Sequence, residues 1–323
     1  MLKRMSLKKL FVSFGALFAL FLIYLIPSNT TYSLKDSIKQ ELEYTNVDIN
    51  KSPIYLLDSD NYLALTDIIV SSEISDIEAR AKELLEILIN DGEGESKIPS
   101  GFRAVLPSET KILSVKYENN VLKVNFSKEL LNVEKKDEER IVEAIVYSLT
   151  TIENVDKIII YIDGEILTKL PKTSINLPST LDRNFGINKE YNINSTTNIN
   201  QVNVYYINKY NKDYYYVPVT KYLNDDREKI QIVIDELSSG HLYNTNLMSF
   251  LNSNTRLLAV ENSSDVLTLM FNQYIFDEID SKTLLEEVIY TISLSIADNY
   301  DVKEVIFMCD NEQIYKSVLK TIE

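Results

Sequence analysis

The sequence contains very few of the residues from which most catalytic and metal sites are built. Among its 323 residues are one Cys, one His, no Trp and only seven Gly. One Cys cannot form an intramolecular disulfide, and one Cys with one His cannot supply the four ligands of a structural zinc site. The glycines form no GxGxxG, GxxxxGK(S/T) or GxSxG motif. These absences exclude the common nucleotide-binding and serine-hydrolase motifs.

The charge of the chain argues against a nucleic-acid partner. The sequence has 48 Asp and Glu against 33 Lys and Arg, which gives a formal net charge of −15. Binding to a phosphate backbone requires clustered basic residues that release counterions, so we expect no nucleic-acid partner. The length favours two domains, and the apolar fraction of 45% is ordinary for a globular protein.

The N-terminus has the pattern of a membrane anchor. Four basic residues within positions 1–9 precede an uncharged apolar run from Leu10 to Ile26, which Pro27 ends. As a helix this run covers about 25 Å, enough for a thin bilayer core. It is followed neither by an A-x-A cleavage pattern nor directly by a Cys that could carry a lipid. We predict an uncleaved single-pass transmembrane helix at 10–27, with residues 1–9 in the cytoplasm and the rest of the chain outside it.

The remainder of the chain contains a duplicated unit. Val121–Ser127 aligns with Val266–Asn272, and Val155–Asp163 aligns with Val302–Asp310, at separations of 145 and 147 residues. Between these pairs, Tyr147-Ser148-Leu149 is placed opposite Tyr290-Thr291-Ile292. The polar segment between the copies contains two prolines and many Asn, which is typical of a linker. The predicted organisation is a stalk (28–52), a first domain (53–167), a linker (168–201) and a second domain (202–323).

Each copy shows the same order of apolar patterns. Alternating and continuous apolar runs predict strands, and apolar residues at helical spacing predict two helices. Ser75 and Glu78 form a capping-box pattern at the start of the first helix, and Asn119-Asn120 suit a tight hairpin turn. The predicted fold class is α+β, with two tandem β-β-α-β-β-α-β domains whose helices lie on one face of a sheet. The strands and helices predicted in the first copy cover 54–57, 63–70, 77–88, 112–117, 121–126, 141–149 and 158–162.

Several short motifs in this order identify a family resemblance. They are Leu106-Pro107 with Thr110, Val124–Ser127, Leu149-Thr150 and Ile162–Gly164. With the duplication, they make the chain similar to the GerMN domain family, which occurs in duplicate in a bacterial sporulation and spore-germination protein. The second copy departs from the pattern, since Asn272 replaces Ser127 and Asp310-Asn311 replaces Asp163-Gly164.

The resemblance implies an architectural role. The α-β-β-α-β portion of each unit is similar to the ring-building motif of secretion systems and of the channel that joins mother cell and forespore. The implied function is a scaffold that assembles with other membrane-anchored envelope proteins or with copies of itself. The family member we compare is lipid-anchored through a Cys, whereas this chain has an apolar segment. The alternative is a module that binds peptidoglycan or an envelope protein and assists wall or cortex remodelling.

Few individual residues suggest chemistry of their own. His241 follows Gly240 at an expected helix end, and Cys309 lies in an expected interior strand, where both side chains have ordinary structural roles. Asp58 and Asp60 lie in a turn between two strands, where Asp is a common turn residue, and the following residues do not fit a calcium loop. We therefore expect no catalytic residue, no metal site and no cofactor, and expect that the protein is not an enzyme.

A concentration of tyrosines opens the second copy. In an extended strand Tyr214 and Tyr216 lie on one face, with Tyr215 and Val217 on the other. One of these faces is expected to remain aromatic and exposed, where it could stack on a glycan or contact a protein. The tyrosines of this segment are Tyr205, Tyr206, Tyr210, Tyr214, Tyr215, Tyr216 and Tyr222.

Overall fold

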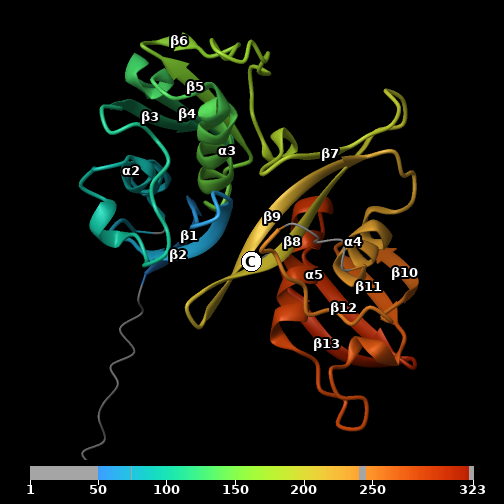
Figure 1. Cartoon of the computed structure of the whole chain (residues 1–323). Helices are drawn as coiled ribbons and strands as arrows, with labels where there is room; N and C mark the ends of the chain where they lie inside the picture. The colour runs from blue at the N-terminus through green and yellow to red at the C-terminus, as the bar shows by residue number, and fades with distance from the viewer. Residues whose placement is uncertain (1–49, 74, 240–244, 320–323) are drawn as a thin grey trace, which may run out of the picture. The chain divides into compact units, whose positions relative to one another are not determined.

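A computed structural model describes residues 50–73, 75–239 and 245–319 of the chain (Figure 1). The predicted anchor at 10–27, the basic segment before it, most of the stalk and His241 lie outside these residues. Among the residues described, no helix is both long enough and apolar enough to cross a bilayer.

Both repeats have the predicted α+β order, and each contains one strand more than predicted. The additional strands, β6 and β13, follow turns in which Asp163 and Asp310 have positive φ angles of 48° and 49°. The first repeat consists of β1 (Lys51–Leu57), β2 (Leu63–Ile69), α2 (Ile77–Leu88), β3 (Ile112–Glu118), β4 (Val121–Phe126), α3 (Glu138–Leu149), β5 (Lys157–Ile162) and β6 (Glu165–Ile166). The second consists of β8 (Asn200–Tyr210), β9 (Asp213–Leu223), α4 (Lys229–Ser238), β10 (Leu257–Ser263), β11 (Val266–Phe271), α5 (Glu286–Asn299), β12 (Glu304–Cys309) and β13 (Glu312–Val318).

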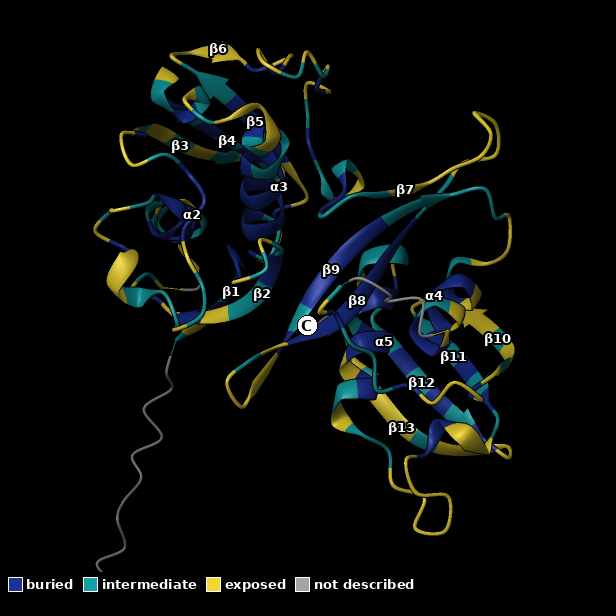
Figure 2. Cartoon of the chain, in the orientation of Figure 1, coloured by how far each residue is buried: buried dark blue, intermediate teal, exposed yellow. Residues whose placement is uncertain are grey.

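Each repeat contains a four-stranded sheet of the same topology. The orders are β3-β4-β5-β6 and β10-β11-β12-β13, with one parallel pair in the middle and antiparallel pairs on both sides. The parallel pairs even share a register, since Val121 pairs with Lys157 and Val266 pairs with Glu304. Figure 2 shows the central strands β11 and β12 largely buried and the edge strands β10 and β13 largely exposed.

The helices bury the alternate residues of these sheets, as the apolar periodicity predicts. On β4 the buried residues are Leu122, Val124 and Phe126, and the residues between them are partly exposed. The buried stripe of α3 packs into the same core as these strands. The start of α2 differs from the prediction, because Asp76 is the N-cap and its carboxylate accepts a hydrogen bond from the Ala79 N–H. Asp is as good a cap as Ser, so the local pattern did not distinguish the two positions.

The structure also corrects the alignment of the second helices. Ser148 accepts a hydrogen bond from the backbone N–H of Tyr55, and Ser295 accepts one from the backbone N–H of Tyr205. These serines therefore occupy equivalent positions, which places Tyr147 opposite Leu294 and not opposite Tyr290. The error was four residues, about one helical turn, and such a shift leaves most of the apolar face of a helix in place. In both repeats the helix thereby covers the edge of the first strand.

A third sheet joins the two repeats. In this sheet β1 pairs with β2, β8 pairs with β9 along its full length, and β2 contacts β9 through the bridge between Leu65 and Tyr216. The same edge of β9 continues with a parallel pair to β7 (Glu190–Asn192). The backbone of the first repeat thus continues into the sheet of the second.

The segment 168–201, expected as a linker, is packed structure for much of its length. Leu170, Leu181 and Ile187 are at most 2% exposed and belong to the core of the first repeat. Leu181 also forms a β-bridge with Ile158 of β5. Its polar composition concealed these apolar residues, because they are too widely spaced to form a periodic pattern.

The carboxylate of Glu83 on α2 ties the helix to the segment after β2. It accepts hydrogen bonds from the N–H groups of Ser71 and Ser72, at 2.7 and 2.9 Å, and from the Lys97 ammonium. Partial burial acts to raise the pKa of Glu83, but these hydrogen bonds outweigh burial and lower the pKa to about 2. The ionised form therefore stabilises the fold.

We expect Glu83→Gln to lower the free energy of unfolding by about 2 kcal/mol at pH 7. Because the folded-state pKa is depressed, this stabilisation is complete above the ordinary value of 4.5 and is lost as the pH falls toward 2. Urea unfolding of both proteins between pH 7 and pH 2 measures the difference. Glu86→Gln, on the same helix at an exposed ion pair with Lys82, serves as the control and should show little change. An equal effect of both substitutions at every pH would contradict the assignment.

Candidate interaction surfaces and the junction between the repeats

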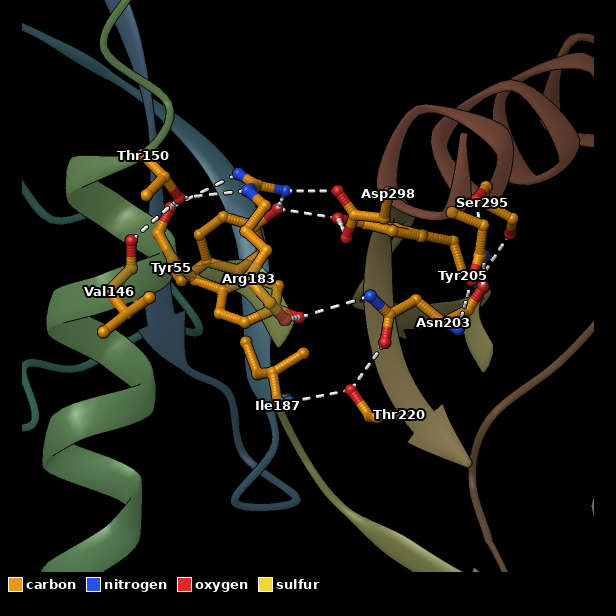
Figure 3. A network of polar contacts seen from close by, with 12 residues as sticks. Tyr55, Val146, Thr150, Arg183, Ile187, Asn203, Tyr205, Thr220, Ser295 and Asp298 are labelled. Atoms are coloured by element: carbon orange, nitrogen blue, oxygen red, sulfur yellow. Dashed lines mark hydrogen bonds and ion pairs between the residues drawn. The ribbon is translucent and has the colours of Figure 1, made fainter. Parts of the chain in front are cut away.

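The junction between the repeats is centred on an ion pair between Arg183 and Asp298 (Figure 3). Arg183 belongs to the connecting segment and Asp298 lies near the end of α5. The Arg183 guanidinium donates to Asp298 Oδ1, and its Nε donates to Thr150 Oγ1 at 3.0 Å. The side chain of Asp298 is 4% exposed and that of Arg183 is 26% exposed. The ion pair therefore links the connecting segment, α3 of the first repeat and α5 of the second.

Three buried tyrosines surround this ion pair. The hydroxyls of Tyr55 and Tyr205 lie 2.7 Å apart, and Tyr205 donates to Asp298 Oδ2 at 2.9 Å. The guanidinium carbon of Arg183 lies 4.9 Å from the ring centroid of Tyr147, a cation–π distance. Tyr55 and Tyr205 are equivalent residues of the two repeats, as their matching serine contacts show. The equivalent strands β1 and β8 therefore meet through equivalent tyrosine side chains.

Burial sets the protonation state of these groups. It raises the pKa of Tyr205 well above its usual value, and the nearby Asp298 raises it further. Burial opposes the charge of Arg183, but Asp298 and the tyrosine oxygens outweigh it, so the pKa of the guanidinium is raised. The tyrosines stay neutral hydrogen-bonding groups, and the Arg183 guanidinium stays charged.

Asn188 completes the backbone pairing where β2 and β9 diverge. Its side-chain N–H groups donate to the carbonyls of Leu63 and Pro218, at 2.9 and 2.7 Å. Its Oδ1 accepts from the N–H of Leu63 at 3.0 Å. Pro218 has no N–H to offer a neighbouring strand, so the amide of Asn188 fills the position between the strands.

Asp58 and Asp60, taken from the sequence as turn residues, also reach the second repeat. Asp58 Oδ1 accepts from the N–H groups of Asp60 and Tyr62, which makes it the turn residue that was predicted. Its Oδ2 accepts from Asn208 Nδ2 and from the Tyr215 hydroxyl, both at 3.0 Å. Asp58 is therefore a second contact between the repeats. Within the described part of the chain, no cluster of His, Cys, Asp or Glu is placed to hold a metal ion.

The tyrosines of β9 alternate as predicted. Tyr215 and Val217 are buried, whereas Tyr214 is 43% exposed and Tyr216 is partly exposed. Tyr214 packs edge-on against Phe250 with ring centroids 5.3 Å apart, and Tyr216 lies 5.7 Å from Tyr290 of α5. Tyr205 and Tyr206 are buried in the structure, so only part of the tyrosine-rich segment is accessible. Cys309 is buried on β12, in the interior strand expected for it.

Each four-stranded sheet has a second face that points away from the helices. We represent this outer face by six of its residues on the first sheet and by the six equivalent residues on the second. Glu118 and Lys316 lie on the same two faces. The first outer face is represented by Lys116, Lys123, Asn125, Lys157, Ile159 and Tyr161. The second outer face is represented by Glu261, Thr268, Met270, Glu304, Ile306 and Met308. A shallow hollow of about 230 Å³ lies over the second face and is lined in part by Met270 and Met308. The sequence analysis placed the helices on one face of each sheet but did not single out the residues of the opposite face.

Comparison with known proteins identifies the family. The sequence pattern described as "Germane: Sporulation and spore germination" matches residues 53–168 and 203–315, which are the two repeats. The chain belongs to this family. The spore germination protein GerM of Bacillus subtilis is 31% identical over 288 residues, covering 86% of this chain and 77% of GerM. The solved tandem GerMN domains of that protein match with a TM-score of 0.74 at 30% identity, covering 81% of this chain and 91% of the solved one.

The second repeat keeps the local structure of the family motifs, although it has Asn272 and Asn311 where the first repeat has Ser127 and Gly164. Ser127 Oγ accepts a hydrogen bond from the Lys111 N–H, and Asn272 Oδ1 accepts one from the Arg256 N–H, both at 3.0 Å. Asn311 adopts a positive φ of 62° at the position of Gly164. Asn is the non-glycine residue that tolerates this conformation best, so the turn is retained. The departures noted in the sequence are therefore equivalent solutions of the same local structure.

We expect Asp298→Asn to lower the free energy of unfolding by about 3 kcal/mol, because it leaves the Arg183 charge without its partner in a largely buried site. Asp265→Asn, in the exposed pair with Lys303, is the matched control and should change stability by less than about 0.5 kcal/mol. Chemical denaturation measures both. Similar small effects of the two substitutions would show that the junction does not depend on this ion pair.

Proposed function

We propose that the protein is an extracytoplasmic scaffold of a sporulation-associated envelope complex. The observation that carries the proposal is the joining of two GerMN domains into one compact unit, each with an uncovered sheet face. A scaffold needs fixed spacing between its binding surfaces, which the buried junction around Arg183 supplies. It needs no catalytic residue.

Membership of a family described by sporulation and spore germination supports the biological setting. The similarity of the α-β-β-α-β portion to the ring-building motif suggests the mode of assembly, in which domains of neighbouring proteins pack side by side. The predicted helix at 10–27 would hold the domains at the outer surface of the cell membrane. Confinement to that surface raises the effective concentration of neighbours, so individually weak contacts suffice for assembly.

A second candidate is a module that binds peptidoglycan. The accessible aromatic side chains around Tyr214 and Tyr290, which are 43% and 45% exposed, favour it. Aromatic rings of this kind can stack on sugars. The two functions predict different molecules to be recovered together with the protein from its membrane.

The test is crosslinked affinity capture of the full-length tagged protein from membranes of sporulating cells, with mass spectrometry of the recovered proteins. We expect other anchored envelope proteins that contain ring-building or GerMN-like domains, in amounts that indicate several copies per complex. An untagged strain and a tagged, unrelated single-pass protein are the controls. Recovery of wall fragments alone would favour the peptidoglycan-binding module, and recovery matching the controls would refute the scaffold.

A further inference from the structure

The two outer faces carry opposite charges at equivalent positions. Lys116 of β3 corresponds to Glu261 of β10, since each pairs with the same position of the next strand. Lys157 of β5 corresponds to Glu304 of β12 in the same way. Both positions on the first face are thus basic and both on the second are acidic. The first face also carries Lys123 with the acidic Glu118, and the second also carries Lys316 of β13, so the first face is net basic and the second net acidic.

The charges of these faces are only partly neutralised within the chain. Lys123 pairs with Glu118 at 2.7 Å, and Glu304 pairs with Lys316 at 2.8 Å. Lys116, Lys157 and Glu261 are exposed, and among the residues described none of the three has an ion-pair partner. The remaining charge is therefore available to an external partner.

Between the charges, both faces have a more apolar centre. On the first, Ile159 and Tyr161 are partly exposed side by side with Lys123 and Asn125 of β4. On the second, Ile306, Met270 and Met308 take the equivalent positions. Of these, Met270 and Met308 line part of the hollow of about 230 Å³. Met side chains adapt their shape to a partner and make favourable contacts with aromatic rings, so this hollow suits a side chain such as Tyr161.

We propose that the first outer face of one copy docks on the second outer face of another copy of this chain. The inference rests on the proposed scaffold function and names the surfaces that it uses. Sheets that pack face to face lie about 10 Å apart with their side chains interdigitated, a geometry open to both faces. The contact sets Lys116 and Lys157 against Glu261 and Glu304, around an apolar centre.

The charge pattern selects this pairing over the others. Two first faces would bring lysines together, and two second faces would bring glutamates together, so neither symmetric dimer is favoured. The two faces of one chain are exposed or partly exposed, and within the described part of the chain no ion pair joins one face to the other. A contact between unlike faces leaves one face of each kind free at the ends of any assembly. It therefore propagates, closing into a ring or extending as a filament.

The test is a charge exchange between two variants of the full-length chain in detergent. Variant one carries Lys116→Glu and Lys157→Glu, and variant two carries Glu261→Lys and Glu304→Lys. Each alone places like charges in contact, and we expect at least a tenfold weaker self-association by analytical ultracentrifugation at low salt. Mixed in equal amounts they regain opposite charges at every contact, and association should return to near the wild-type level.

The control is Lys135→Glu with Lys212→Glu, which changes the net charge as variant one does at exposed positions outside both faces. It should associate like the wild type, and matching unfolding curves show that all variants fold. Undiminished association of the single variants, or no recovery on mixing, would overturn the docking surface while the capture experiment still supports a scaffold. A wild-type chain that stays monomeric would overturn self-docking.

Carbodiimide crosslinking supplies an independent readout. In an equal mixture of ¹⁴N- and ¹⁵N-labelled wild-type chains, we expect crosslinks between Lys116 or Lys157 and Glu261 that join one isotope to the other. Crosslinks confined to chains of one label would show that these residues meet only within a molecule, which contradicts the proposal.

Discussion

Arg183 and Asp298 lose much of their contact with water where the two repeats meet, and the surrounding structure compensates for that loss. A largely buried ion pair is tolerated only when its remaining hydrogen-bonding groups find partners. Thr150, the residue after α3, supplies one, and Tyr205 of β8 supplies another. Because these residues come from both repeats and from the connecting segment, the three parts hold their relative positions together. Removing either member of the ion pair leaves the other charge largely buried without its partner.

The contacts within and between the repeats also determine which surfaces of the protein remain free. The first strand of each repeat is covered at its edge by a helix, through Ser148 in one case and Ser295 in the other. The second strands are used in the sheet that joins the repeats, through the Leu65 and Tyr216 bridge and Asn188. Among the described elements, these contacts leave the outer face of each four-stranded sheet uncovered. A protein that works by contact has these faces to offer.

The sequence predicted those features of the fold that follow from the local spacing of apolar residues. Buried stripes such as that of α3, and the alternation of Tyr214 to Val217, follow directly from helix and strand geometry. It did not reveal the junction, because Arg183 and Asp298 are 115 residues apart and nothing local marks either as a partner. It missed β6 because a strand of two residues has no pattern. The four-residue misalignment of the second helices shows the same limit, since a shift of about one helical turn keeps most of the apolar stripe in place.

Comparison of the two repeats separates what the fold requires from what it permits. Tyrosine occupies the equivalent positions 55 and 205, and Ser127 and Asn272 accept equivalent backbone hydrogen bonds, because the local structure needs these contacts. Lys116 and Glu261 differ in sign at one structural position, so the fold requires neither charge there. Reversal at two such positions on the same face gives the two repeats complementary surfaces rather than merely different ones. Complementary faces on opposite repeats of one chain favour contacts between unlike repeats, which is the arrangement a repeating assembly needs.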